Sequence, residues 1–148
     1  MRGSIMCGVD GSPDSQAALR VATRLSEQLG ARLVVAHVVQ PEQLRPVGGG
    51  PLPVLMPPFG AGIDAGQKLL EQLLEAHGLV DVDRRVGTGV PADRLADLAD
   101  EEDAVMIVVG SRGRGAFRAA FLGSVSNELI GVARCPVLVV PPGAVEAG

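Results

Sequence analysis

The chain has 148 residues, a length that suits one domain built around one hydrophobic core. It carries 17 acidic and 13 basic side chains, which gives a formal net charge of −4, and aromatic residues make up only 2% of it. An acidic chain with so few stacking side chains is not expected to bind nucleic acid or an anionic membrane surface. No apolar run approaches the roughly 18 residues of a membrane span, and the first residues lack an apolar signal-peptide region. The sequence therefore predicts a cytoplasmic protein.

The cysteines and histidines are interpreted as structural residues. Cys7 and Cys135 each lie in or beside an apolar stretch, without a second cysteine or a histidine at metal-binding spacing. His37 lies inside an apolar run, and His77 ends a leucine-rich segment. Two separated histidines cannot form a zinc site by themselves.

The first part of the chain predicts a strand, a helix and a second strand. The apolar run 5–9 predicts the first strand. Ser12 is suited to cap a helix that begins at Pro13, and Gly30 is suited to end that helix. The run 32–39 predicts the second strand.

The middle of the chain combines a loop, a helix and an edge strand. Residues 40–62 are rich in proline and glycine, which predicts a long flexible loop beside the ligand-binding edge. The leucine stripe of 63–77, followed by Gly78, predicts the second helix. Residues 80–86 alternate apolar with polar side chains, as an edge strand with one wet face does.

The last part of the chain completes an alternating pattern. It predicts a helix over 91–101, an apolar strand over 104–109 and a glycine- and arginine-rich connection over 110–123, then a helix over 124–133 and a strand over 136–140. Strands that alternate with helices form a doubly wound parallel sheet with helices on both faces. We therefore expect one α/β domain over residues 1–148 with a five-stranded, Rossmann-like or flavodoxin-like sheet.

The connection after the fourth strand has the composition of an anion site. In doubly wound sheets, ligands bind beyond the carboxyl ends of the strands. Glycines let the backbone approach a ligand, and the first N–H groups of a helix attract an anion. The contributing residues are the glycines Gly110, Gly113 and Gly123, the helix start Ser124, Val125 and Ser126, and the arginines Arg112, Arg114 and Arg118. These residues predict a phosphate site, and the alternative is an ordinary glycine-rich turn with surface arginines.

The spacing of this connection resembles a known nucleotide signature. The chain has no GxxxxGK[ST] motif, and its GxG pair lacks the third glycine of GxGxxG. The spacing Gly110-x2-Gly113-x9-Gly123-Ser124 is similar to the G-2x-G-9x-G-[S/T] signature in the ATP-binding branch of the universal stress protein family. Three further stretches, 8–12, 37–39 and 135–140, look like the same family. The resemblance covers about residues 4 to 141, which is nearly the whole chain.

The resemblance implies a strand order, a cofactor and a set of binding residues. It implies the order 3-2-1-4-5 and ATP as the ligand. From the residues, Asp10 is the acidic side chain placed to bind a Mg²⁺ ion together with phosphate oxygens and waters. By position, the implied set is Gly8, Val9 and Asp10 at the adenosine, Val38 at the adenine, and Gly110, Gly113, Gly123, Ser124, Val125 and Ser126 at the ribose and phosphates. Arg112 is the candidate phosphate ligand among the three arginines, and the choice between them stays open. The residues alone also allow a turn-forming carboxylate for Asp10 and an ordinary core role for Val38.

Two other families with this layout fit the residues less well. A receiver domain needs an acidic cluster after the first strand and a lysine after the fifth, whereas the single lysine, Lys68, lies on a predicted helix. A flavodoxin needs aromatic side chains against its flavin, and the chain has only three phenylalanines.

The expected function is a nucleotide-loaded, dimeric switch in the stress response. The apolar run 137–140 predicts a homodimer through the fifth strand, which a charge at Val139 would disfavour. The alternatives are a dimeric interaction module with a vestigial nucleotide site and a slow ATP hydrolase. No Gln, Glu or His stands beside the glycines to orient an attacking water, so we expect hydrolysis to be absent or very slow.

Overall fold

A computed structural model describes residues 3–40, 61–112 and 122–144. In chain order its elements are β1 (Ser4–Gly8), α1 (Pro13–Leu29), β2 (Arg32–Val39), α2 (Ala61–Ala76), β3 (Asp83–Thr88), α3 (Pro91–Glu101), β4 (Ala104–Gly110), α4 (Ser124–Val132) and β5 (Val137–Val140). The five strands pair in parallel in the order β3-β2-β1-β4-β5. The predicted α/β class, the parallel sheet and the strand order are all confirmed.

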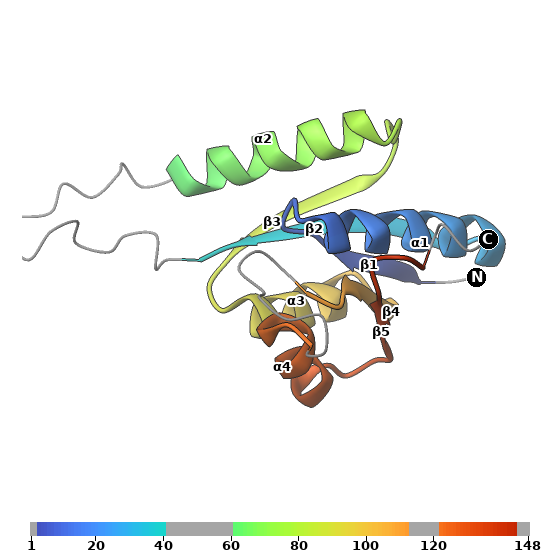
Figure 1. Cartoon of the computed structure of the whole chain (residues 1–148), viewed down its shortest axis with the longest axis vertical. Coiled ribbons are helices and arrows are strands. Elements are labelled where there is room, and N and C mark those ends of the chain that lie inside the picture. Colours follow the sequence, from blue (N-terminus) through green and yellow to red (C-terminus); the bar gives the residue numbers. More distant parts are fainter. Residues whose placement is uncertain (1–2, 41–60, 113–121, 145–148) are drawn as a thin grey trace, which may run out of the picture.

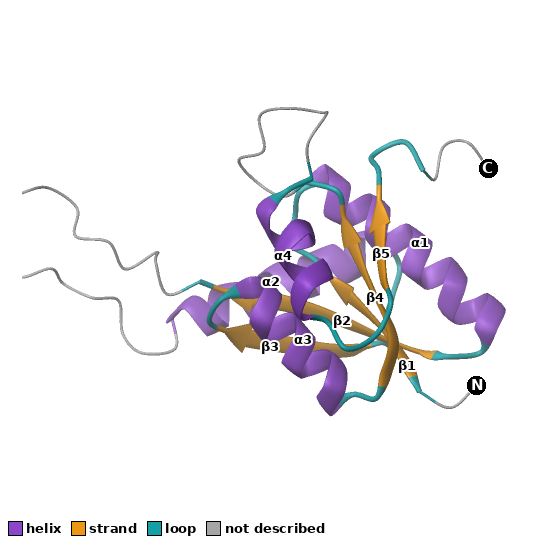
Figure 2. Ribbon diagram, turned by 90° about the horizontal axis from the view of Figure 1, so that it is seen from below, coloured by secondary structure: helices purple, strands orange, loops and turns teal. Residues whose placement is uncertain are grey.

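Helices cover both faces of the sheet. Figure 1 shows α1 and α2 on one face and α3 and α4 on the other, and Figure 2 shows the strands fanned between these layers. Along β1, Ile5 and Cys7 pack into the core under α1 and α2, whereas Met6 packs into the core on the α3 and α4 side. Because both faces are covered, the central strands are apolar at nearly every position.

The residues predicted to begin and end the first helix do so in the structure. The Ser12 hydroxyl caps α1 by accepting the Ser15 N–H at 3.2 Å, and Pro13 occupies the first helical position. Gly30 ends α1 in a left-handed conformation with φ 64°, which glycine adopts without steric cost. The predicted bounds of β2 and α3 match the observed ones.

The predicted third strand is displaced along the chain. The alternation of residues 80–86 predicts a strand there, but β3 runs from Asp83 to Thr88. Leu79 and Val82 pack against the core from the connection after α2, while Val80 lies on the surface. Of the two valines that extend the alternating pattern before β3, Val82 therefore packs on the core from the connecting segment and Val80 does not. β3 does lie at the edge of the sheet, as predicted.

The proline- and glycine-rich segment was predicted over residues 40–62. Residues 61 and 62 are the first two residues of α2 instead, and residues 41–60 lie outside the described residues. Within the described ranges, no helix is both long and apolar enough to cross a membrane.

Both cysteines are free thiols held in apolar surroundings. Cys7 is fully buried, and burial raises the pKa of its thiol to about 12. Cys135 is half-buried, and burial followed by the nearby Asp100 carboxylate raises the pKa of its thiol. A raised thiol pKa lowers the fraction of reactive thiolate, which agrees with a packing role for both residues.

Candidate functional site

The topological switch point of the sheet lies between β1 and β4. The chain leaves β1 toward β2 on one side of the sheet, while β4 and β5 lie on the other side. Backbone groups beyond the carboxyl ends of the two central strands therefore border a crevice, as in other doubly wound sheets. The predicted site residues after β1 and β4 meet at this edge, which we call the carboxyl edge.

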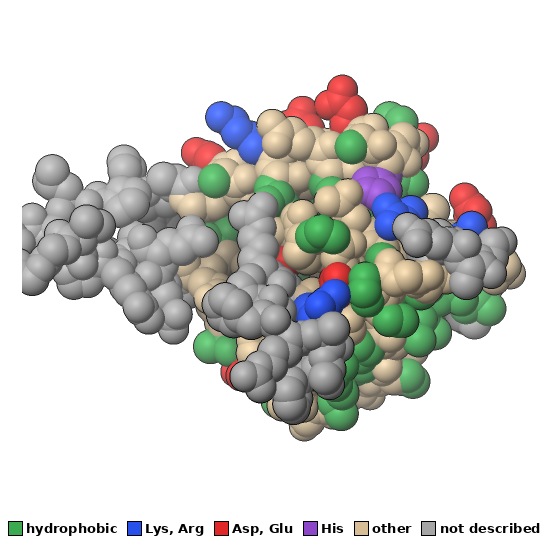
Figure 3. All heavy atoms as spheres, in the orientation of Figure 1, with side chains coloured by type: hydrophobic (Ala, Val, Ile, Leu, Met, Phe, Trp, Pro, Cys, Tyr) green, Lys and Arg blue, Asp and Glu red, His purple; other side chains and the backbone are tan. Residues whose placement is uncertain are grey.

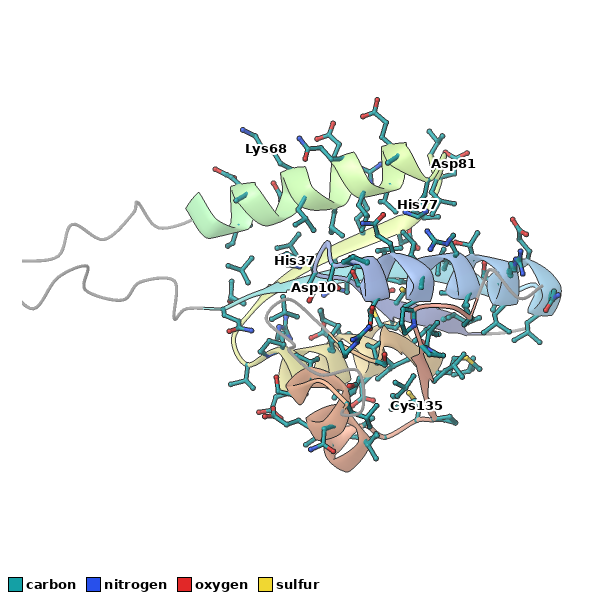
Figure 4. All side chains as sticks on the ribbon, in the orientation of Figure 1. Asp10, His37, Lys68, His77, Asp81 and Cys135 are labelled. Atoms are coloured by element: carbon teal, nitrogen blue, oxygen red, sulfur yellow. The ribbon has the colours of Figure 1, made fainter. Side chains whose placement is uncertain are left out.

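The segment after β1 is held by hydrogen bonds to β2 and to the start of α1. The Val9 N–H donates to the Ala36 carbonyl at 2.9 Å, and the His37 ring nitrogen Nδ1 donates to the Val9 carbonyl at 2.8 Å. The Asp10 carboxylate accepts the Ser12 N–H at 2.9 Å, which forms the turn that the residues alone suggested. Figure 4 labels Asp10 and His37 at this edge. His37 therefore has the structural role predicted for it.

At two glycines of the predicted site, close packing leaves no room for a side chain. A Cβ on Gly8 would lie 2.9 Å from a methyl group of Leu95 on α3. A Cβ on Gly110 would lie 2.6 Å from the carbonyl carbon of Asp14, a backbone atom at the start of α1. Gly110 thus lets α1 approach the end of β4. This close approach is a second explanation beside the predicted contact with a ligand.

Ser111, the first residue after β4, connects four elements of the sheet edge. Its N–H donates to the Val140 carbonyl of β5 at 2.9 Å, and its hydroxyl donates to the Asp14 carboxylate of α1 at 3.0 Å. Its carbonyl accepts the Gly123 N–H at 2.6 Å, just before α4. The start of α4 is therefore held against the ends of the strands by backbone bonds.

Arg112 is paired with a buried carboxylate. Its backbone N–H and its side-chain Nε each lie 3.1 Å from the Asp14 oxygen Oδ2. Asp14 is only 4% exposed, so this ion pair is screened little by solvent. The predicted phosphate ligand Arg112 is at the carboxyl edge, and its charge is balanced there by Asp14.

The residue before α4 offers no side-chain cap. Gly123 precedes the helix with φ −65° and ψ 162°, and a glycine has no side chain that could accept the first N–H groups of the helix. Ser124 is exposed and Val125 half-buried, while Ser126 is buried with its hydroxyl directed at the carbonyls of Ser111 (3.2 Å) and Gly123 (3.1 Å). The backbone N–H groups at this helix start can therefore receive an anion, while the Ser126 hydroxyl holds the helix in place.

A groove of about 420 Å³ lies next to this helix start. Its lining residues come from the end of β2, the turn before α3, the start of α3 and the first turns of α4: Gln40, Gly89, Val90, Pro91, Ser124, Val125 and Glu128. The volume falls within the roughly 300–1,000 Å³ of small-molecule sites. Valine and proline walls beside a carboxamide, a hydroxyl and a carboxylate suit a ligand with a flat apolar part and polar edges.

The remaining predicted site residues are distributed as follows. Val38 is 9% exposed and packs into the core on the α3 side, so it has the core role that the residues alone allowed. Gly113 lies outside the described residues, as do Arg114 and Arg118. Within the described ranges, no group of three or more His, Cys, Asp or Glu side chains could hold a metal ion. The magnesium role of Asp10 stays a prediction.

Sequence reasoning missed Asp14, Ser111 and the groove. Asp14 and Ser111 are separated by 97 positions and meet only because α1 starts beside the end of β4. One feature of the sequence could have indicated Asp14. It lies in the first turn of the helix that follows the first strand, and that turn is at the carboxyl edge, where ligands bind.

Comparison with known proteins agrees with this geometry. A sequence profile of the Universal stress protein family matches residues 1–141. The chain belongs to the universal stress protein family. A universal stress protein of Mycolicibacterium smegmatis is 35% identical over 142 residues, which cover 93% of this chain and 45% of that protein. A universal stress protein of Thermus aquaticus is 32% identical over 137 residues, which cover 93% of this chain and 97% of that one. This chain thus spans about half the length of the mycobacterial relative.

Solved universal stress proteins share the fold. The protein UspA from Lactobacillus plantarum superposes with a TM-score of 0.74 at 21% identity, over 93% of this chain and 97% of that one. A universal stress protein crystallised in complex with cAMP gives a TM-score of 0.64 at 27% identity, over 95% and 97% of the two chains. One from Archaeoglobus fulgidus in complex with dAMP gives 0.61 at 25% identity, over 93% and 97%.

Proposed function

We propose that this universal stress protein binds an adenine nucleotide, ATP, at the carboxyl edge and acts as a nucleotide-loaded dimeric switch in the stress response. The observation that carries the proposal is the start of α4, preceded by a glycine that offers no side-chain cap, beside a groove of nucleotide size. Two relatives of the same fold were crystallised with cAMP and with dAMP, which supports an adenine nucleotide as the ligand.

The chemistry of the groove suits the two ends of a nucleotide. The side chains of Val90, Pro91 and Val125 offer apolar surface to a base, which matters in a chain with so few aromatic residues. The Gln40 carboxamide can both donate to and accept from the polar edge of the base. The N–H groups at the start of α4 attract phosphate through their own partial charge and the helix dipole.

Mg²⁺ would accompany the triphosphate. The Asp10 carboxylate lies at the same edge and is the hard oxygen ligand that this ion prefers. Mg²⁺ bound with phosphate oxygens and water needs only one or two protein carboxylates, so the residue set is sufficient. The ion would neutralise phosphate charge, while the backbone of α4 orients the phosphates.

The first test is the nucleotide itself. Protein purified without added nucleotide is denatured, and the released small molecules are identified by mass. We expect ATP or another adenine nucleotide in the supernatant. Absence of any nucleotide, together with no heat of binding for ATP, AMP or adenosine, would favour the vestigial-site alternative.

A pair of substitutions at Gly123 tests the role of α4. The φ and ψ of Gly123 are open to any residue, and both Asp and Asn are good helix caps, so Gly123→Asp and Gly123→Asn should both fold. The aspartate adds a negative charge where phosphate would lie, so ATP affinity should fall about tenfold further in Gly123→Asp than in Gly123→Asn. Equal ATP affinity in the two variants, measured by calorimetry, would remove this helix start from the phosphate site.

The dimer is proposed to form through β5, the edge strand next to β4. Side chains of Leu122, Ile130, Val132 and Leu138 are exposed around α4 and β5. Figure 3 shows apolar surface gathered at the lower right, on the side where Figure 1 draws β5. The better test position is Leu138: Val139 was predicted to face outward, but it is half-buried and packs on the α3 and α4 side. Leu138→Glu should shift the particle mass in light scattering from dimer to monomer. An unmodified protein that is monomeric at tens of micromolar would contradict the dimer.

Hydrolysis distinguishes the switch from an enzyme. A single-turnover assay with radiolabelled ATP, with Gly123→Asp as the binding-deficient control, should release phosphate far more slowly than an enzyme does. Phosphate release at about 1 s⁻¹ or faster, the lower edge of typical turnover, would make this protein an ATPase.

A further inference from the structure

Asp14 joins the two residues that follow β4 to the first turn of α1. Its Oδ2 accepts the Ser111 hydroxyl at 3.0 Å, and the Arg112 backbone N–H and Nε at 3.1 Å each. The residue is 4% exposed, and the Arg112 side chain is 25% exposed. One buried carboxylate oxygen therefore accepts hydrogen bonds from both the backbone N–H and the guanidinium of Arg112.

This carboxylate lies close to the proposed phosphate end of the site. Ser111 donates its hydroxyl to Asp14 and accepts the Gly123 N–H through its carbonyl at 2.6 Å. Ser111 thus connects the Asp14 carboxylate to Gly123, the residue that precedes α4. A negative charge at this short range raises the free energy of any phosphate at the helix start, because a partly buried site screens charges weakly.

The pairing also changes what Arg112 can offer a ligand. A free guanidinium at this edge would bind a phosphate with charge-assisted hydrogen bonds. Here its Nε is already bonded to Asp14, so the pair contributes one positive and one negative charge. Each phosphate added to the nucleotide gains less from this edge than it would from an unpaired arginine.

We propose that Asp14 is a specificity-determining residue that reduces the preference of the nucleotide site for ATP over AMP. The inference rests on the proposed nucleotide site and deepens it. A site with weak discrimination between the two nucleotides responds to their ratio, which suits a switch better than saturation by ATP alone.

The test uses calorimetric titrations of the full chain with adenosine, AMP and ATP. Asp14→Asn keeps an oxygen that can accept the Ser111 hydroxyl, and it releases the charge of Arg112. In this variant we expect adenosine affinity within about twofold of wild type and ATP affinity about tenfold higher, close to the lower end of what one charge-assisted hydrogen bond contributes. Because the effect is electrostatic, it should shrink when salt is raised from 0.1 to 1 M.

Two further variants separate charge from folding. Arg112→Gln leaves the Asp14 charge unbalanced, so ATP affinity should fall while adenosine affinity stays unchanged. Asp93→Asn removes an exposed carboxylate from the first turn of α3 and is the matched control, for which we expect less than about a twofold change with any of the three ligands. If Asp14→Asn does not fold, Asp14→Ser, which also removes the charge and keeps an oxygen acceptor, replaces it in the same titrations.

The outcomes distinguish the two proposals. If wild type binds the nucleotides and Asp14→Asn weakens adenosine, AMP and ATP by the same factor, Asp14 is a structural residue only and the inference is overturned. If Asp93→Asn raises ATP affinity as much as Asp14→Asn does, the effect is general electrostatics and the inference is likewise overturned. If wild type binds none of the three ligands, the proposed function fails and the inference fails with it.

Discussion

The amino and carboxyl edges of the sheet differ in how their charged side chains are paired. At the amino edge, where β2 and β3 begin and α3 ends, Arg32 pairs with Asp83 at 2.6 Å and with Glu102 at 2.9 Å. Arg85 pairs with Glu101 at 2.6 Å and again with Glu102 at 2.5 Å. Most of these side chains are a third to a half exposed, so each pair is screened and adds little stability.

At the carboxyl edge, the described residues form one ion pair, and backbone groups supply most of the polar contacts. Asp14 and Arg112 form one shielded pair, and Gly110 lets the start of α1 lie against the end of β4. At this edge Gly123, the residue before α4, offers no side-chain cap to the helix. This difference indicates where a ligand can bind. At the amino edge the charged side chains are already paired with one another, whereas at the carboxyl edge backbone N–H groups can donate to a ligand.

The largest expected effect comes from filling the close approach at Gly110. In Gly110→Ala the new Cβ would meet the Asp14 backbone at 2.6 Å, and a backbone cannot move aside as a flexible side chain can. Urea denaturation should show a loss of about 2 kcal/mol or more in the free energy of unfolding. Gly131→Ala is the matched control: a Cβ there meets nothing within 4 Å, and alanine in a helix should add up to about 1 kcal/mol. Equal stabilities of the two variants would mean that α1 and β4 can separate at little cost.

A medium effect is expected for two buried serines, one at each edge. The Ser126 hydroxyl donates to carbonyls at the start of α4, and the Ser4 hydroxyl donates to the Glu102 carbonyl at 2.7 Å. Each change to alanine should cost about 1 kcal/mol of unfolding free energy. Only Ser126→Ala should also weaken ATP binding, by about threefold, because it loosens the helix start at the carboxyl edge. A parallel loss of ATP affinity in Ser4→Ala would erase the distinction between the edges.

The smallest effect is expected at the amino edge and depends on pH. Hydrogen bonds first from Arg32 and then from Arg85 hold the pKa of Glu102 below its usual range. A carboxyl with a lowered folded-state pKa adds stability above its unfolded-state pKa, and this stability is lost as pH falls through the lowered value.

Glu102→Gln should therefore cost at most about 1 kcal/mol at neutral pH and progressively less below about pH 4. Urea denaturation of both proteins at pH 7 and pH 3 measures the difference. A gap that is unchanged at pH 3, or that is insensitive to salt at pH 7, would show that Glu102 acts through packing.

Much of the fold was predictable because its signals are local. The run Arg32–Val39 is long, apolar and bounded by Gly30, so β2 could be placed correctly, and Pro91 marks the start of α3. β3 was displaced because Val80 and Val82 follow the alternating pattern outside the strand. Hydrogen bonding to β2 sets the bounds of β3, with Val34 opposite Asp83 and Val39 opposite Thr88. A single strand's pattern does not contain that pairing.

The sequence by itself determined the order of the elements, the helix caps and the spaced glycines after β4, because each depends on residues that are near one another in the chain. Only the tertiary structure decided that Asp14 would hold Ser111 and Arg112 across nearly a hundred positions. It also decided that Gly110 would admit a backbone, and that the ends of β2 and the starts of α3 and α4 would line one groove. Parallel strands bring their carboxyl ends to one edge whatever their separation in the chain, so the contacts at that edge depend on how the whole sheet packs.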